Sequence, residues 1–230
     1  MEKNRGPARR ARSAWHDGAS VVILEEPFPS GIVGIVRTDD SDTAFRAAVA
    51  GVEGGLQTIQ VSMTAPDALD IARGVAASTG ARVGLGSMTD PKAVAQAKKA
   101  RIPFIATPFL HPEVAAAARR EGIVCVMGAT TPSEVFQADR AGAAMVDVFP
   151  IGSMGGPSYV RLLREPFPTL PLWASGGVDF DDIPEYLELG VVVGLTTGVF
   201  PIDALRRGDF AAVRELASRA TAMSPRAVWG

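Results

Sequence analysis

From residue 31 onward, short apolar runs alternate with longer segments whose apolar residues recur at helical spacing. Eight of these runs are rich in β-branched residues and are bounded by glycine, proline or polar residues, which is typical of buried strands. They cover residues 31–37, 57–63, 82–86, 103–107, 123–127, 144–149, 170–175 and 191–196. A helix is expected in every gap, and this alternation predicts a parallel sheet.

Several of the intervening segments carry signals for the start or the end of a helix. Cap-type or first-turn residues stand at Ser41, Thr89-Asp90-Pro91, Thr131-Pro132-Ser133-Glu134 and Asp179. Glycines stand where helices should stop, at Gly122, Gly142 and Gly190. Eight such units in about 190 residues fit a closed, parallel eight-stranded (β/α)8 TIM barrel of minimal size. The alternative is an open doubly wound sheet. The even spacing of the units and the lack of a dinucleotide-binding fingerprint argue against it.

The length of 230 residues and the apolar fraction of 47% suit one compact domain of barrel size. We expect a basic, disordered tail over residues 1–25, for which a functional arm is the alternative. The barrel should occupy residues 26–222, followed by a C-terminal tail over residues 223–230. The only cysteine, Cys125, lies in an apolar run, where a small buried residue is expected.

Charge and hydropathy exclude some classes of partner. The formal net charge is -2 and the pI is about 5.8, which argues against a protein whose task is to hold nucleic acid. No run of about 18 or more consecutive apolar residues occurs, so no membrane span is expected. We therefore expect a soluble, cytoplasmic protein.

Two glycine-rich segments follow the seventh and eighth predicted strands, at Ser175-Gly176-Gly177 and at 194–198 (GLTTG). In barrels of this kind, active sites lie at the carboxyl ends of the strands, and phosphate often binds at these two loops. Glycines let backbone N–H groups approach a phosphate closely. The alternative is that these glycines only permit tight turns.

The order of motifs resembles that of the 2-keto-3-deoxy-6-phosphogluconate and 4-hydroxy-2-oxoglutarate aldolase family over roughly residues 31–205. The resemblance is carried by residues 34–37 (GIVR), 59–68 (IQVSMTAPDA), 83–87 (VGLGS), 104–108 (FIATP), 128–134 (GATTPSE), 148–150 (VFP), 155–156 (GG) and 175–178 (SGGV). It implies a homotrimeric class I aldolase barrel that cleaves a 2-keto-3-deoxy acid into pyruvate and an aldehyde. The family uses a lysine imine on the sixth strand and a glutamate on the second.

This chain departs from the family at both catalytic positions, where it has Asp147 and Gln60. An aspartate does not form an imine with a ketone, and a glutamine does not relay protons as a carboxylate does. The four lysines of the chain, in the tail and in the third predicted helix, do not reach the strand ends. The pair of changes indicates a repurposed site, although a deliberately inactivated enzyme would look the same.

What the resemblance retains is a binding pocket. It implies that Arg37 and Ser87 face the carboxylate and keto end of a pyruvate-like ligand. It further implies that the opposite end of the ligand carries a phosphate, which would be held by Gly176, Gly177, Thr196 and Thr197. Thr107 and Phe149 are also expected to contact the ligand. Arg37 also has an interpretation as a surface charge, and Ser87 and Thr107 as turn residues.

Asp147 itself has several interpretations, because an aspartate inside an apolar strand is rarely tolerated without a partner. It could be a structural residue paired with Arg37, an acid or base, or a divalent-metal ligand together with His111. No cofactor is otherwise expected. The leading hypothesis is an aldolase-family enzyme that binds a 2-keto acid or sugar phosphate and performs imine-independent chemistry with Asp147, while Gln60 orients the substrate. The rival is a non-catalytic ligand sensor or trimeric scaffold.

Overall fold

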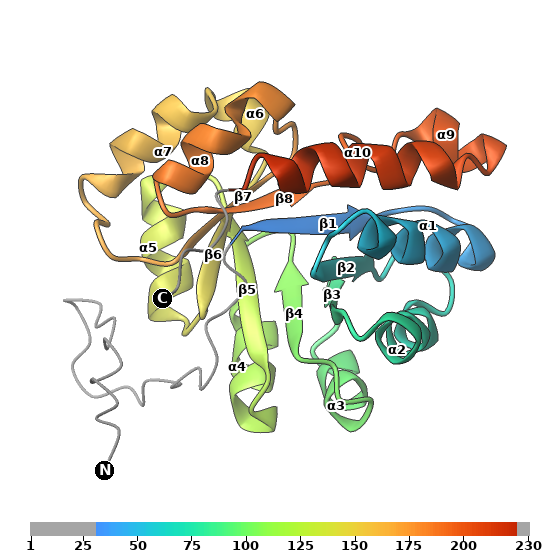
Figure 1. Cartoon of the computed structure of the whole chain (residues 1–230). Helices are drawn as coiled ribbons and strands as arrows, with labels where there is room; N and C mark the ends of the chain where they lie inside the picture. The colour runs from blue at the N-terminus through green and yellow to red at the C-terminus, as the bar shows by residue number, and fades with distance from the viewer. Residues whose placement is uncertain (1–30, 225–230) are drawn as a thin grey trace, which may run out of the picture.

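The computed structural model describes residues 31–224, in which eight parallel strands close into a barrel with helices around it (Figure 1). The strands are β1 (Ile32–Val36), β2 (Thr58–Ser62), β3 (Arg82–Gly86), β4 (Phe104–Thr107), β5 (Val124–Ala129), β6 (Met145–Val148), β7 (Leu172–Ser175) and β8 (Val192–Leu195). They follow one another around the barrel in chain order, and β1 pairs with β8 to close it. The predicted (β/α)8 barrel is confirmed, and the open sheet is excluded.

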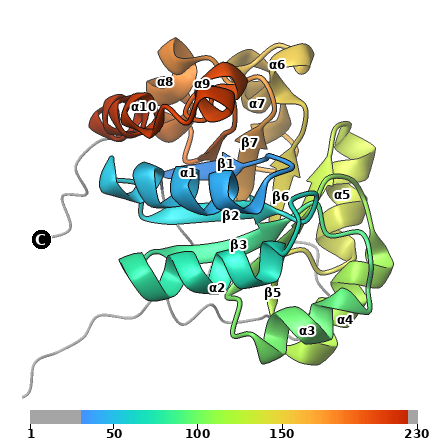
Figure 2. The same ribbon diagram turned by 90° about the vertical axis from the view of Figure 1, so that its right-hand side faces the viewer.

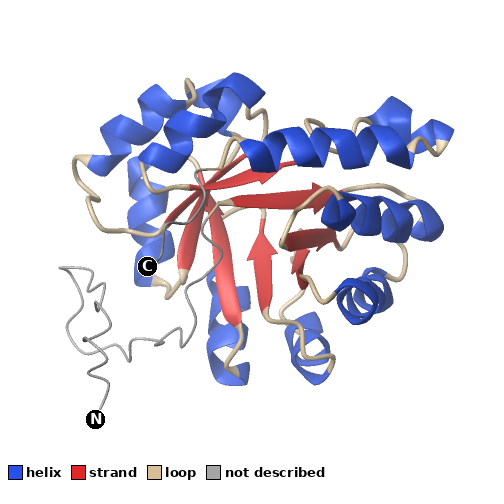
Figure 3. Cartoon of the chain, viewed as in Figure 1, coloured by secondary structure: helices blue, strands red, loops and turns tan. Residues whose placement is uncertain are grey.

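The helices lie on the outer side of the barrel, as the views in Figures 2 and 3 show. They are α1 (Ser41–Glu53), α2 (Ala68–Thr79), α3 (Ala93–Lys99), α4 (Pro112–Glu121), α5 (Pro132–Arg140), α6 (Ile151–Met154), α7 (Pro157–Arg164), α8 (Ile183–Glu188), α9 (Ile202–Arg207) and α10 (Phe210–Ala222). A short 3-10 helix, η1 (Phe180–Asp182), precedes α8. Each predicted strand lies where the apolar pattern placed it, and helices fill every gap between strands.

Two sets of apolar side chains hold this architecture together. The larger set fills the space between the barrel and the surrounding helices. The smaller set fills the barrel interior and includes Val33, Ile35, Phe104, Val126 and Trp173. Burial of these side chains on both faces of each strand explains the near-continuous apolar runs of the sequence. The barrel interior below the strand ends is therefore packed with apolar side chains.

The helix signals of the sequence are confirmed at some positions and are shifted at others. Thr131 forms a full capping box with Glu134 at the start of α5, and Gly122 ends α4 in the left-handed conformation. The start of α1 is capped by Asp40, one residue before the predicted Ser41. Asp179 caps η1 and not α8, because the chain makes a 3-10 turn before the helix begins.

Three further expectations concern single residues and the ends of the chain. Cys125 is buried, and desolvation raises the pKa of its thiol to about 12. The predicted tail over residues 1–25, and residues 225–230 of the predicted C-terminal tail, lie outside the described residues. Within residues 31–224, no helix is long and apolar enough to cross a membrane.

Candidate active site

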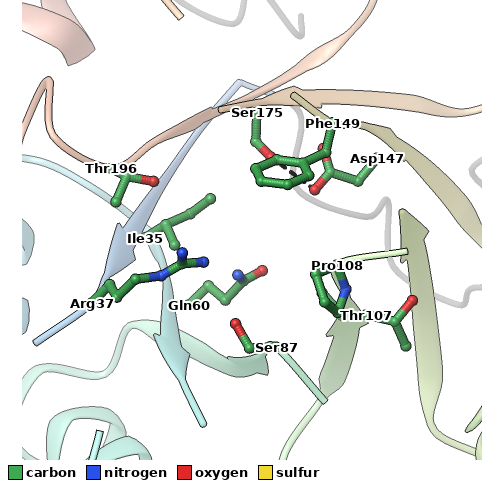
Figure 4. A pocket seen from close by; sticks show the side chains of 11 residues that line it. Ile35, Arg37, Gln60, Ser87, Thr107, Pro108, Asp147, Phe149, Ser175 and Thr196 are labelled. Carbon is green, nitrogen blue, oxygen red and sulfur yellow. Dashed lines mark hydrogen bonds between the residues drawn. The ribbon is translucent and has the colours of Figure 1, made fainter. Parts of the chain in front are cut away.

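A pocket opens at the carboxyl ends of the barrel strands, where the fold was expected to place a site (Figure 4). Residues from seven of the eight strands, or directly after them, contribute to its walls, and only β5 contributes none. The lining residues are Ile35, Arg37, Gln60, Ser87, Ala106, Thr107, Pro108, Asp147, Phe149, Ser175 and Thr196. The cavity measures about 30 Å³, which is room for about two water molecules.

Asp147 lies on the inward face of β6 and is 9% exposed. Its Oδ2 accepts a hydrogen bond of 2.8 Å from the hydroxyl of Ser175 on the neighbouring strand β7. Its Oδ1 is buried and has no hydrogen-bond partner among the described residues. A buried carboxyl oxygen without a partner is rare in folded proteins, because the lost hydration is not replaced. Oδ1 of Asp147 is thus an acceptor in a residue that lines the pocket.

The environment of Asp147 changes its acidity. Burial in the barrel disfavours the charged form and raises its pKa to about 7, while the hydrogen bond from Ser175 acts in the opposite direction and only partly offsets this. Both protonation states are therefore populated near neutral pH. A carboxyl group with this acidity is suited to give and take protons, as ordinary surface aspartates are not.

The structure corrects two of the pairings that the sequence allowed for Asp147. Within residues 31–224, Arg37 forms no ion pair with Asp147, and the partner is Ser175 instead. His111 does not line the pocket: it precedes α4, and its ring contacts Glu113 Oε2 at 3.1 Å and the carbonyl of Thr89 at 3.0 Å. The structure therefore does not bring His111 to the pocket that Asp147 lines. Across this part of the chain, no cluster of three or more His, Cys, Asp or Glu side chains could hold a metal ion.

Gln60 lies on the inward face of β2 and is 7% exposed. Its amide packs directly over the backbone of Gly86 on β3, where an added Cβ would lie only 2.0 Å from Nε2. Glycine at position 86 is therefore required for the side chain of Gln60 to take this position. The amide group reaches the pocket from the side that also holds Arg37 and Ser87, as Figure 4 shows.

Ser87 lies at the end of β3 in a left-handed backbone conformation, with φ of +56°. This conformation is uncommon outside glycine and is found at functional sites when the surroundings hold it. The hydroxyl of Ser87 is 3.0 Å from that of Ser62, which is in turn 2.8 Å from that of Thr64. The chain of hydroxyl groups holds Ser87 at the edge of the pocket, beside the exposed guanidinium of Arg37.

The remaining predicted residues fall into two groups. Phe149 and Thr196 line the pocket as expected. Thr107 also lines it, but its hydroxyl donates to the carbonyl of Phe109 at 2.7 Å, and in Figure 4 its side chain points away from the centre. The hydroxyl of Thr107 thus serves a turn, which agrees with its interpretation as a turn residue.

The glycines after β7 lie next to the pocket and do not line it. Gly176 and Gly177 have φ of +79° and +82°, and an added Cβ at Gly176 would lie 2.6 Å from the ring of Phe149. The carbonyl of Gly176 accepts a hydrogen bond from the N–H of Gly152 at the start of α6. These two glycines therefore pack against the segment that follows β6. Thr197 is likewise not among the lining residues.

Sequence reasoning did not assign a role to Ser175, the partner of Asp147. It was considered only as the first residue of a glycine-rich loop. Its proximity to Asp147 could have been predicted in principle, because side chains alternate along a strand and neighbouring strands bring their inward-facing residues together. The apolar lining residues Ile35, Ala106 and Pro108 also carried no signal of their own.

Comparison with known proteins assigns a family to this geometry. The family model for KDPG and KHG aldolase matches residues 28–216. The 2-dehydro-3-deoxy-phosphogluconate aldolase of Pseudoalteromonas atlantica is 27% identical over 87% of this chain and 95% of its own length. The KHG/KDPG aldolase of Escherichia coli is 26% identical over 90% and 96%. A crystal structure of the 2-keto-3-deoxy-6-phosphogluconate aldolase of Zymomonas mobilis with 3-phosphoglycerate superposes with a TM-score of 0.76, at 25% identity, over 86% of this chain and 94% of that one.

Proposed function

Because the chain belongs to the KDPG and KHG aldolase family, we propose that it is a lyase-family enzyme that binds a small 2-keto acid and transfers a proton at the carbon next to the keto group, without forming an imine. The observation that carries this proposal is Asp147. Its carboxyl group is buried at the pocket, has one oxygen unpartnered and has a pKa raised to about 7 by desolvation. Such a group is ionised often enough at neutral pH to act as a base.

The chemistry follows from the groups that line the pocket. In its ionised form, Oδ1 of Asp147 takes a proton from the carbon next to the keto group. The electron pair of that C–H bond forms the C=C bond of an enolate, and the π pair of the C=O bond moves onto the oxygen. Gln60 carries amide N–H donors, and a hydrogen bond from Nε2 would stabilise the enolate oxygen. Asp147 then returns a proton to carbon. The net step is exchange when a solvent proton has replaced the first one on Asp147, and isomerisation when the proton returns to another position of the enolate.

The rest of the substrate is held by polar groups at the edge of the pocket. The guanidinium of Arg37 binds the carboxylate of the substrate, and the hydroxyl of Ser87 donates a further hydrogen bond to it. We place a phosphate, where the substrate has one, at the loops that contain Gly176, Gly177, Thr196 and Thr197. The crystal structure of the Zymomonas mobilis relative with 3-phosphoglycerate supports a phosphorylated ligand. We also propose a homotrimer in the cytoplasm, on the strength of the family resemblance.

The test is solvent exchange at the methyl group of pyruvate, followed by proton NMR in deuterated buffer. We expect the wild-type protein to accelerate loss of the methyl signal, and Asp147→Ala and Asp147→Asn to reduce that rate by about 100-fold or more. Asp70→Asn is the matched control, because Asp70 lies on the exposed surface of α2. Equal exchange in Asp147→Asn, or covalent trapping of pyruvate by borohydride in the wild type, would contradict the proposal.

A second candidate is a non-catalytic ligand sensor or scaffold, and the small cavity of about 30 Å³ favours it. This volume is smaller than that of a pyruvate molecule. In this case the wild-type protein would show no methyl exchange at any pH between 6 and 9. Ligand binding, measured as a shift in the unfolding temperature, would persist and would not respond to Asp147→Asn.

A further inference from the structure

The pocket presents opposite charges on opposite walls. Arg37 at the end of β1 and Asp147 on β6 are the only charged side chains among the residues that line it. Figure 4 shows the two side chains on opposite sides, with Gln60 between them. They form no ion pair in the described part of the chain, so each is available to a ligand group of the opposite charge.

No other charged group competes for Asp147 from the elements packed against β6. The neighbouring strands β5 (Val124–Ala129) and β7 (Leu172–Ser175) contain no charged residue, and neither does α6. The charged residues of α5 belong to a helix on the outside of the barrel, whereas Asp147 faces the interior. Within residues 31–224, the elements packed against β6 therefore supply no cation to Asp147.

The hydrogen bond from Ser175 leaves one place for a ligand on Asp147. Ser175 occupies Oδ2, while Oδ1 is buried and unpartnered. An ionised carboxylate is an acceptor only, so the ligand group that fits Oδ1 is a hydrogen-bond donor. A cationic donor fits best, because the pair then neutralises a buried charge and the hydrogen bond is charge-assisted.

We infer that the pocket also takes a small 2-amino carboxylic acid, with its ammonium group on Oδ1 of Asp147 and its carboxylate on Arg37. This inference rests on the proposed pocket and deepens its specificity. A 2-amino acid carries the two charges on adjacent carbons and matches the two walls. A 2-keto acid carries only the carboxylate and leaves Asp147 without an ionic partner. Ile35 and Ala106 line the same pocket and restrict the ligand to a small side chain.

The inference gives a sign for the pH dependence. An ammonium group needs the ionised form of Asp147, whose fraction rises with pH through the pKa of about 7. The apparent affinity is reduced by the fraction that is not ionised, so binding should be about tenfold tighter at pH 8 than at pH 6. Near pH 7, binding should release about half a proton. Pyruvate has no ammonium group, so its affinity should not rise with pH.

The experiment is isothermal titration of the full-length protein with alanine, as both enantiomers, and with pyruvate. We expect alanine to bind more tightly as the pH rises from 6 to 8. Asp147→Asn should lower the affinity for alanine at least tenfold and change the affinity for pyruvate by less than about threefold. The side-chain amide of asparagine has nearly the same shape but no charge, and its nitrogen donates hydrogen bonds, so the variant removes the ion pair with an ammonium group while it preserves the packing. Arg37→Met should lower the affinity for both ligands, and Asp70→Asn should change neither affinity.

The outcomes separate this inference from the proposed function. Methyl exchange in pyruvate without alanine binding would overturn the inference and leave the proposed function in place. Alanine binding that depends on Asp147, without methyl exchange, would support the inference and overturn the proposed reaction. Alanine binding that is unchanged in Asp147→Asn, or that weakens as the pH rises, would overturn the inference.

Discussion

The hydroxyl of Ser175 on β7 donates to Oδ2 of Asp147 on β6 across 2.8 Å in the barrel interior. The register of the two strands places Asp147 opposite Trp173, so Ser175 is the next residue of β7 that faces inward. This geometry leaves Oδ1 without a partner among the described residues. Ser175 thus determines which oxygen of the carboxyl group is free for the proposed reaction.

The first prediction concerns Ser175→Ala. The hydrogen bond lowers the pKa of Asp147, so its removal should raise that pKa above about 7. The midpoint of the Asp147 titration, followed by carbon NMR of the labelled carboxyl group, should move to higher pH. Ser175→Thr keeps the hydroxyl and should move it much less. An unchanged midpoint in Ser175→Ala would show that the bond does not act on Asp147.

A second prediction concerns the stability of Asp147→Asn. The folded-state pKa of Asp147, about 7, is above the ordinary aspartate value of 3.8, so the unfolded state binds fewer protons between these values. Stability therefore falls as the pH rises from about 4 to about 7, and this loss is complete above the folded-state pKa. The shift corresponds to about 4 kcal/mol as an upper value.

The measurement is urea unfolding of both proteins from pH 4 to pH 8. The free energy of unfolding should be similar at pH 4, and the variant should be more stable by about 2–4 kcal/mol at pH 8. Asp70→Asn should follow the wild type throughout. A difference that does not change with pH would show that Asp147 has an ordinary pKa in the folded protein.

The fold could be predicted from the sequence because it depends on periodicity. Strands such as β5 and β8 are buried on both faces, so they read as short apolar runs, and the segments between them carry helical spacing. The family motifs added the positions that matter at the strand ends. Seven predicted site residues, including Arg37, Gln60 and Asp147, line one pocket.

The contacts within the site could not be predicted in the same way. The partner of Asp147 is Ser175, 28 residues later in the chain. Their contact depends on the register between β6 and β7, which cannot be read from the sequence. His111 was a candidate because it follows a strand, yet its ring is bound at the start of α4 by Glu113 and by the carbonyl of Thr89. A position at a strand end is thus easier to predict than the direction of its side chain.

The third prediction concerns Gly86→Ala. An added Cβ would lie 2.0 Å from Nε2 of Gln60, so the amide must leave its position over β3. We expect loss of methyl exchange to the level of Gln60→Ala, and destabilisation by about 1–3 kcal/mol from overpacking. In the double variant Gly86→Ala/Gln60→Ala the clash is absent, so stability should partly recover and exchange should fall no further. Additive losses of exchange would show that Gly86 acts independently of Gln60.

The last prediction places an amine at the floor of the pocket. Asp147→Lys puts a primary amine on the inward face of β6, where burial lowers the pKa of lysine and leaves more of it in the nucleophilic neutral form. With pyruvate and borohydride, we expect a covalent adduct, detected as a gain in mass of the intact protein and located at residue 147 by peptide mapping. Gln60→Glu in the same protein should speed its formation, because a carboxylate can transfer the protons that imine formation requires.

Wild-type protein treated in the same way is the control for Lys92, Lys98 and Lys99, the lysines that the described part of the chain contains. It should remain unlabelled, because these residues lie in or beside α3 and do not line the pocket. Asp147→Met should also remain unlabelled, and its circular dichroism shows whether the barrel tolerates a long side chain at this position. If Asp147→Lys is folded and does not trap pyruvate, then residue 147 does not face the bound keto group, and the placement of Asp147 in the proposed reaction is wrong.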